Sequence, residues 1–168
     1  MNLNEAKQQF IQSWGVLGSS WGINRTMAQI HALLLIAPEA LNADEIMEAL
    51  QISRGNANMN IRELINWGIV EKVLKPGDRK EYFSAEKDIW KVAMRIMKER
   101  KKRELDPMIT VIEQIKSVDE NKKDAETKAF IDTISQIQKF AKQADSALGG
   151  LIKADENWFT GTLLKLFK

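Results

Sequence analysis

Residues 53–83 read SRGNANMNIRELINWGIVEKVLKPGDRKEYF. Ser53 is a residue type that favours a helix N-cap, and apolar residues then recur three and four positions apart as far as Trp67. Gly68 is typical of the position just after a helix end. Two short apolar runs follow, and the Pro-Gly turn between them predicts a β-hairpin. This stretch therefore predicts a helix followed by a two-stranded sheet.

The residues upstream predict three more helices. The first runs over 3–19, and the second, over 25–36, contains HALLLIA, which is apolar on nearly every side and is typical of a central buried helix. Asn42 followed by Glu45 is a helix-start signal and precedes a short third helix. A buried helix, two short helices joined by a tight turn, and a hairpin together make a winged helix-turn-helix.

The chain after the hairpin is predicted to be helical again. A helix from Asp88 to Arg103 is followed by Asp106-Pro107, which predicts a new helix start after a kink or short link. The polar run 117–124 predicts a loop, and Gly149-Gly150 predicts a bend. Between them an apolar seam with heptad-like spacing favours contact with another helix, either in a second copy or in the same chain. The seam and the tail after it contain Phe130, Ile134, Ile137, Ala141, Ala144, Leu148, Leu151, Trp158 and Phe159.

Composition argues against most enzyme and metal-site classes. The chain has 168 residues, no Cys and a single histidine, His31, so disulfides, thiolate sites and most imidazole chemistry are excluded. His31 lies in an apolar helix and is expected to be a packed core residue. We expect no catalytic residues, no cofactor and no metal. The start of the chain resembles no export signal and no run approaches a membrane span, so a cytoplasmic protein that does not enter membranes is expected.

The polar face of the 53–67 helix has side chains suited to reading DNA. Arginine can bind guanine at two points, asparagine can bind adenine, and a methionine methyl can contact a thymine methyl. A solvated surface is the alternative explanation of the same face. The candidate DNA-binding residues here are Ser53, Arg54, Gly55, Asn56, Asn58, Met59 and Arg62, with Asn60 and Glu63 on the same polar side.

The hairpin turn adds three cations that are expected to cluster at a projecting tip, Lys75, Arg79 and Lys80. Such a tip is typical of a wing that reaches the backbone or minor groove. The segment 88–103 has seven basic and two acidic residues, a net charge of +5, whereas residues 1–87 have nine basic and ten acidic. The basic run fits either attraction to DNA or a solvated helix face.

The same residues carry a family resemblance. SRGNANMNIRELINWGIVEKV with PGDRKEYF and AEKD, and upstream WGVLGSSWGINRTMAQIHALLLIAPEALNADEI, resemble MarR-type regulators, specifically the GbsR-like branch, over about residues 10–103. The resemblance implies a homodimeric, sequence-specific DNA-binding transcriptional regulator. Its 53–67 helix would enter the major groove and its wing the minor groove. Some GbsR-like regulators respond to quaternary amines, and Trp14, Trp21 and Trp90 could form an aromatic cage for a small-molecule effector or simply pack in the core.

The predicted fold class is mainly α, with a winged helix-turn-helix DNA-binding domain over 1–87, a two-stranded β-wing, and a linker helix with a helical dimerisation region over 88–168. The expected partners are double-stranded DNA and a second copy of the chain, and the expected activity is repression. The near-neutral charge of residues 1–87 keeps a second hypothesis open, in which the winged helix binds another protein instead of reading an operator.

Overall fold

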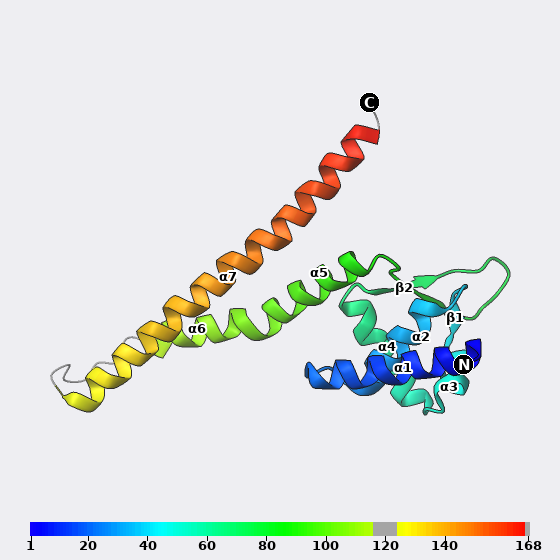
Figure 1. Ribbon diagram of the computed structural model, residues 1–168, viewed down its shortest axis with the longest axis horizontal. Helices are drawn as coiled ribbons and strands as arrows, with labels where there is room; N and C mark the ends of the chain where they lie inside the picture. Colours follow the sequence, from blue (N-terminus) through cyan, green and yellow to red (C-terminus); the bar gives the residue numbers. More distant parts are fainter. Residues whose placement is uncertain (116–123, 167–168) are drawn as a thin grey trace. The chain divides into compact units, whose positions relative to one another are not determined.

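The computed structural model describes residues 1–115 and 124–166, and the side chains as far as Ala154. The described chain divides into two compact units, Met1–Arg95 and the residues from Ile96 onward. In chain order the first unit holds α1 (Leu3–Ser20), α2 (Arg25–Ile36), β1 (Leu41–Asn42), α3 (Ala43–Leu50), α4 (Arg54–Asn66), β2 (Val70–Val73), β3 (Tyr82–Ala85) and the start of α5 (Ile89–Arg100) (Figure 1). The predicted winged helix-turn-helix is confirmed.

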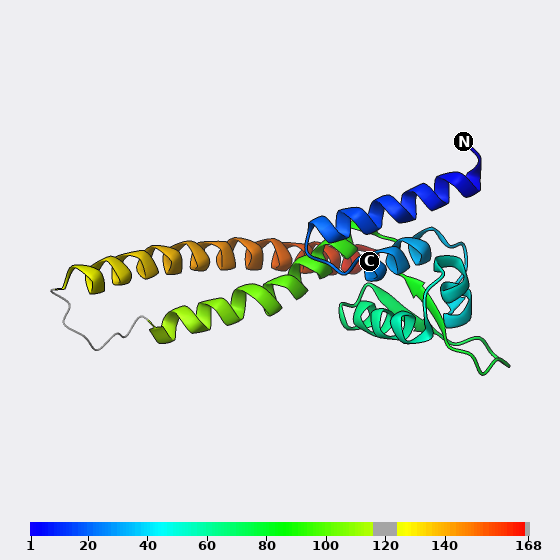
Figure 2. The ribbon, with the colours of Figure 1, turned by 90° about the horizontal axis from the view of Figure 1, so that it is seen from below.

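Helix α2 is the centre of the first unit. It contacts α1, α3, α4 and β3, and Ile30 and Leu34 are fully buried along it. Ile46 of α3 and Leu64 of α4 are likewise almost fully buried. Figure 2 shows α1 lying over α2, and a Cβ added at Gly18 would come within 2.6 Å of the Ala28 side chain. A glycine is therefore needed where these two helices approach most closely.

The sheet corrects one sequence expectation. The predicted hairpin is present as antiparallel β2 and β3, with Val70 opposite Ala85, but a third strand pairs with β3 on its other side. That strand is β1, in which Leu41 lies opposite Phe83. The sequence predicted only a two-stranded wing, since two residues are too short to show an alternating pattern. The added strand fixes the base of the hairpin beside the start of α3.

The predicted helix start at Asn42, which begins α3, is confirmed. The Asn42 side chain accepts hydrogen bonds from the backbone of Asp44 and Glu45, and the Glu45 carboxylate accepts one from the Asn42 N–H at 2.7 Å. This is a complete capping box. Between α3 and α4 the chain reverses through Gln51, which has a left-handed backbone with φ 53°.

Lys87 ties the chain after β3 to the end of α2. Its Nζ donates to the carbonyls of Leu34, Leu35 and Ala37 at 2.7 to 2.9 Å. These carbonyls lie at the helix C-terminus, where backbone acceptors lack intrahelical partners and a cation is favourable. Sequence reasoning missed this contact because it joins positions about fifty residues apart.

The second unit, described by itself, is built from long helices. The chain continues from α5 through a π-helical turn (Lys101–Leu105) into α6 (Asp106–Ile115), and α7 (Ala125–Leu166) packs against α6. Helix α6 begins at Asp106, as predicted, but no link outside a helix precedes it, because Asp106 has helical dihedral angles and its carboxylate binds Lys101 at 2.7 Å. Pro107 cannot donate to the preceding turn, and the wider turn takes up the mismatch without breaking the helix.

Two further predictions fall in this unit. The bend at Gly149-Gly150 is wrong, since α7 continues through both glycines. The polar loop predicted over 117–124 lies outside the described residues, except for Asp124, whose carboxylate accepts from the backbone of Glu126 and Thr127 at the start of α7. Its side chain thus caps the helix.

His31 is a core residue, as predicted. It is 3% exposed, its Nδ1 accepts a hydrogen bond from the Trp14 indole at 3.3 Å, and its Nε2 is buried with no hydrogen-bond partner in the described part of the chain. Burial, and secondarily the positive charge of Lys87, lower the pKa of His31 from 6.5 to about 4. The folded protein therefore keeps this imidazole neutral at physiological pH.

This burial predicts an acid-sensitive loss of stability. Between pH 6.5 and 4 the unfolded chain binds a proton at His31 that the folded chain rejects, so the free energy of unfolding falls as the pH drops, by about 3 kcal/mol in total. Urea unfolding from pH 7.5 to 4 of the native chain and of His31→Gln, which cannot titrate, measures the difference. Equal losses in the two proteins would contradict the assignment.

The left-handed backbone at Gln51 predicts which substitutions stabilise the turn between α3 and α4. A left-handed backbone is unfavourable for residues with a Cβ, so Gln51→Gly should be more stable than Gln51→Ala by about 1 kcal/mol. The alanine variant is the matched control because both changes remove the hydrogen bond from the Gln51 side chain to the Glu48 carbonyl. Denaturant unfolding checks the order, and an alanine variant as stable as the glycine variant would refute it.

Candidate nucleic-acid interface

Helix α4 presents one face to the core and the opposite face to solvent. Ala57, Ile61 and Leu64 are buried against the rest of the unit. Ser53 caps the helix by accepting from the Asn56 backbone at 3.3 Å. Because the buried side chains of α4 form a single stripe, its other side remains available to a partner. The candidate residues Arg54, Gly55, Asn58, Met59 and Arg62 are all exposed on that side.

No other side chain of the described part of the chain covers the centre of this exposed face. Met59 is 61% exposed, and a Cβ added at Gly55 would meet nothing within 4 Å. Within the described ranges no hydrogen bond or ion pair engages the Arg62 side chain. An exposed methionine beside a guanidinium that makes no ion pair in the described ranges suits a contact with base edges.

Two polar residues of α4 do not lie where the sequence predicted. Asn60 is 3% exposed, and its amide donates to the carbonyl and the side chain of Asn56. Glu63 accepts a hydrogen bond from the Trp67 indole at 2.9 Å. Asn60 is buried and Glu63 is half-buried, and both make hydrogen bonds within α4 and its C-terminal end, so the two side chains support the fold. Asn56 is half-buried and shares this role.

The three wing cations do not gather at one tip, which corrects the predicted cluster. Lys75 lies over the Tyr82 ring, 4.0 Å from its centroid, and its Nζ is 3.9 Å from the Glu39 carboxylate. Lys80 reaches back toward α3. Arg79 is exposed, and no ion pair engages its side chain within the described ranges. Arg79 is thus the wing cation that is free to meet a partner.

Asp78 holds the turn in shape. Its carboxylate accepts from the Lys80 backbone at 2.9 Å and from the Tyr82 hydroxyl at 2.7 Å. These hydrogen bonds lower the pKa of Asp78 below its ordinary value. These contacts of Asp78 restrict the conformation of the turn beside Arg79. Arg79 therefore loses less conformational entropy when it binds a partner.

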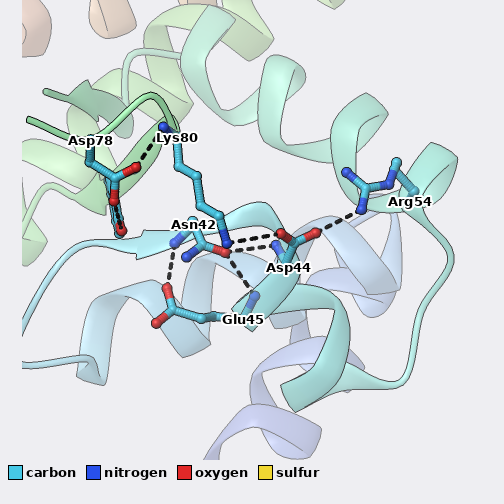
Figure 3. Close-up of polar contacts among 7 residues, drawn as sticks. Asn42, Asp44, Glu45, Arg54, Asp78 and Lys80 are labelled. Atoms are coloured by element: carbon cyan, nitrogen blue, oxygen red, sulfur yellow. Dashed lines mark hydrogen bonds and ion pairs between the residues drawn. The ribbon is translucent and has the colours of Figure 1, made fainter. Parts of the chain in front are cut away.

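Asp44 links the wing to the start of α4 (Figure 3). Its Oδ1 accepts from the Arg54 guanidinium at 2.7 Å, and its Oδ2 lies 3.4 Å from the Lys80 ammonium. The hydrogen bond from Arg54, followed by that from Lys80, lowers the pKa of Asp44. The three side chains line a shallow open groove together with Asn42, Ala43, Asn58, Glu81 and Phe83. Sequence reasoning did not single out Asp44, because its contact with Lys80 joins positions 36 residues apart.

The three predicted effector residues lie in different surroundings. Trp14 packs against Phe10 and donates to His31. Trp21 and Trp90 are 59% and 57% exposed. A cage formed by these three indoles stays a prediction.

The predicted seam on α7 is partly covered within the chain. Ala141 is fully buried, and Ile134, Ala144 and Leu148 are half-buried. Phe130, Ile137 and Leu151 remain 40% to 52% exposed. The side chains of Trp158 and Phe159 lie outside the described residues. The exposed apolar residues leave surface for a further partner.

Other site classes find no support in the described part of the chain. It contains no group of three or more His, Asp or Glu side chains placed to hold a metal ion. None of its helices combines the length and the apolar character that crossing a bilayer requires.

Comparisons with known proteins agree with this geometry. A sequence model of the MarR family matches residues 21–81. The HTH-type transcriptional repressor GbsR of Bacillus subtilis is 27% identical over 112 residues, 67% of this chain and 62% of the relative. The HTH-type transcriptional regulator MmpR5 of Mycobacterium tuberculosis is 32% identical over 76 residues, 45% of this chain and 46% of the relative. The chain thus spans less than two thirds of either relative.

One solved structure shares the fold across most of the chain. A crystal structure of a transcriptional regulator aligns with a TM-score of 0.53 and 21% identity, covering 88% of this chain and 99% of the other. At that identity the likeness establishes the architecture alone.

Proposed function

We propose that the chain is a sequence-specific DNA-binding transcriptional regulator, because a sequence model of the MarR family matches residues 21–81 of its winged helix-turn-helix. The similarity to the repressor GbsR supports repression as its mode of action. In this proposal residues 1–87 bind DNA, and residues 88–168 form the linker helix and the dimerisation region.

The observation that carries the proposal is the free, exposed face of α4 around Met59 and Arg62. A helix of this kind fits the major groove, where Arg62 would bind guanine and Met59 would contact thymine methyls. Arg79 on the ordered wing would reach the backbone or the minor groove. Base contacts give sequence preference, whereas backbone contacts give position and affinity.

Dimerisation follows from the small size of one module. A single helix-turn-helix makes few contacts, and two copies that bind adjacent half-sites gain affinity from their linkage. The exposed seam residues Phe130, Ile137 and Leu151 support α7 as part of the interface between copies.

The first experiment selects bound sequences from a random duplex pool with the purified chain. We expect an enriched inverted repeat with half-sites about ten base pairs apart. Arg62→Ala and Met59→Ala should change the preferred sequence, while Arg79→Ala should weaken all sites more evenly. An Arg62→Ala profile identical to that of the native chain would remove this side chain from base reading.

Salt dependence separates DNA reading from the alternative of a protein-binding winged helix. Binding through phosphates must weaken steeply as salt rises, because it releases counterions. An apolar protein interface responds little to salt. A chain that enriches no sequence and shows no salt-sensitive DNA binding would favour the protein-binding alternative.

The interface proposal predicts the effect of one charge in the seam. Ile137→Asp should shift the chain toward monomer, because a carboxylate is costly to desolvate in an apolar interface. Gln143→Asp is the matched control, since it adds the same charge at an exposed position away from the seam. Light scattering checks the mass of each variant, and an unchanged dimer with Ile137→Asp would refute this role of the seam.

A further inference from the structure

Two cations from separate elements converge on one carboxylate beside the proposed DNA-binding face. Arg54 comes from the first turn of α4 and Lys80 from the end of the wing, and each binds a different oxygen of Asp44 (Figure 3). The three side chains are 50% to 65% exposed, so the cluster lies open to solvent. The geometry shows that both cations can hold a single anionic group at this place.

Resting on the proposed function, we propose that Arg54 and Lys80 bind one DNA backbone phosphate, and that Asp44 occupies this position in the DNA-free protein as an internal competitor. A phosphate offers the same chemistry as the carboxylate, namely adjacent anionic oxygens that accept from a guanidinium and an ammonium. The backbone between a major groove that holds α4 and a minor groove that receives the wing passes between these two elements. The shallow groove there leaves room for a phosphate.

Asp44 is not required to build the fold around it. The Asn42 side chain already accepts the backbone hydrogen bonds of the first turn of α3, and Glu45 completes the capping box. Exposed ion pairs of this kind add little to stability, because water screens the charges. The consequence of the Asp44 charge is therefore expected in DNA binding, where it competes with a phosphate for both cations and repels that phosphate once it is bound.

Asp44 is thus a positioning residue that sets how readily the chain binds any duplex. It reduces the net charge of this cluster from +2 to +1. Each effective charge that meets phosphate contributes about one unit to the dependence of binding on the logarithm of salt concentration. By binding both cations, Asp44 lowers the affinity of the chain for random DNA, which competes with an operator for the protein.

The test compares Asp44→Asn with the native full-length chain on a 30-base-pair random-sequence duplex over a range of salt concentrations. We expect Asp44→Asn to bind roughly fivefold to tenfold more tightly at moderate salt, with a salt slope steeper by about one unit. The control is Glu48→Gln, which removes one exposed charge from the same helix without freeing either cation, and it should gain less than about twofold. Circular dichroism melting checks that each variant is folded.

A coupling measurement separates competition from a general charge effect. When Arg54→Gln and Lys80→Gln are both present, adding Asp44→Asn should gain less than about twofold, because no cation remains to be freed. A gain with Asp44→Asn no larger than that with Glu48→Gln, or weaker binding, would overturn this inference and leave the proposed function standing. A native chain that binds no duplex even at low salt would overturn both.

Discussion

The structure of the first unit depends on the burial of α2 on nearly all sides. Ile30 and Leu34 lie in the core, and the helix contacts α1, α3, α4 and β3 at once. Because one buried helix supports all these elements, the direction of α4 and the base of the wing are set by the same packing. Lys87 closes the end of α2 with three carbonyl hydrogen bonds and joins the chain after β3 to it. The exposed face of α4 is the side that does not pack against this core.

Several cations of the proposed binding surface already have partners within the protein. Fewer of them are therefore free to meet DNA phosphates than the number of Arg and Lys residues suggests. Arg54 and Lys80 share Asp44, and Lys75 lies against Tyr82 and near Glu39. Arg62 and Arg79 stand free of ion pairs in the described ranges, one on α4 and one on the wing. A surface with few free cations binds random DNA weakly, so in the proposed function sequence reading by α4 and the linkage of two copies would supply much of the affinity for an operator.

Predictions that rest on neighbouring residues agree well with the structure. The Asn42 and Ser53 caps, the end of α4 before Gly68 and the hairpin turn all follow from contacts within a few residues. Two failures have a different cause, which is contact with residues distant in the chain. Strand β1 exists only because β3 lies beside it. Asn60 is buried because neighbouring elements cover the edge of the apolar stripe on α4.

The sequence alone determined the order of the helices and the hairpin in the first unit, the apolar stripe of α4 and the candidate residues on its other side, since periodicity and capping are local properties of the chain. The tertiary structure decided which of those residues are free to bind. It placed Asp44 between Arg54 and Lys80, moved Lys75 onto Tyr82 and buried Asn60, while leaving Met59 and Arg62 exposed. Charge pairing and burial depend on residues brought together from distant positions, as Lys80 and Asp44 are across 36 residues, and no local pattern carries that information.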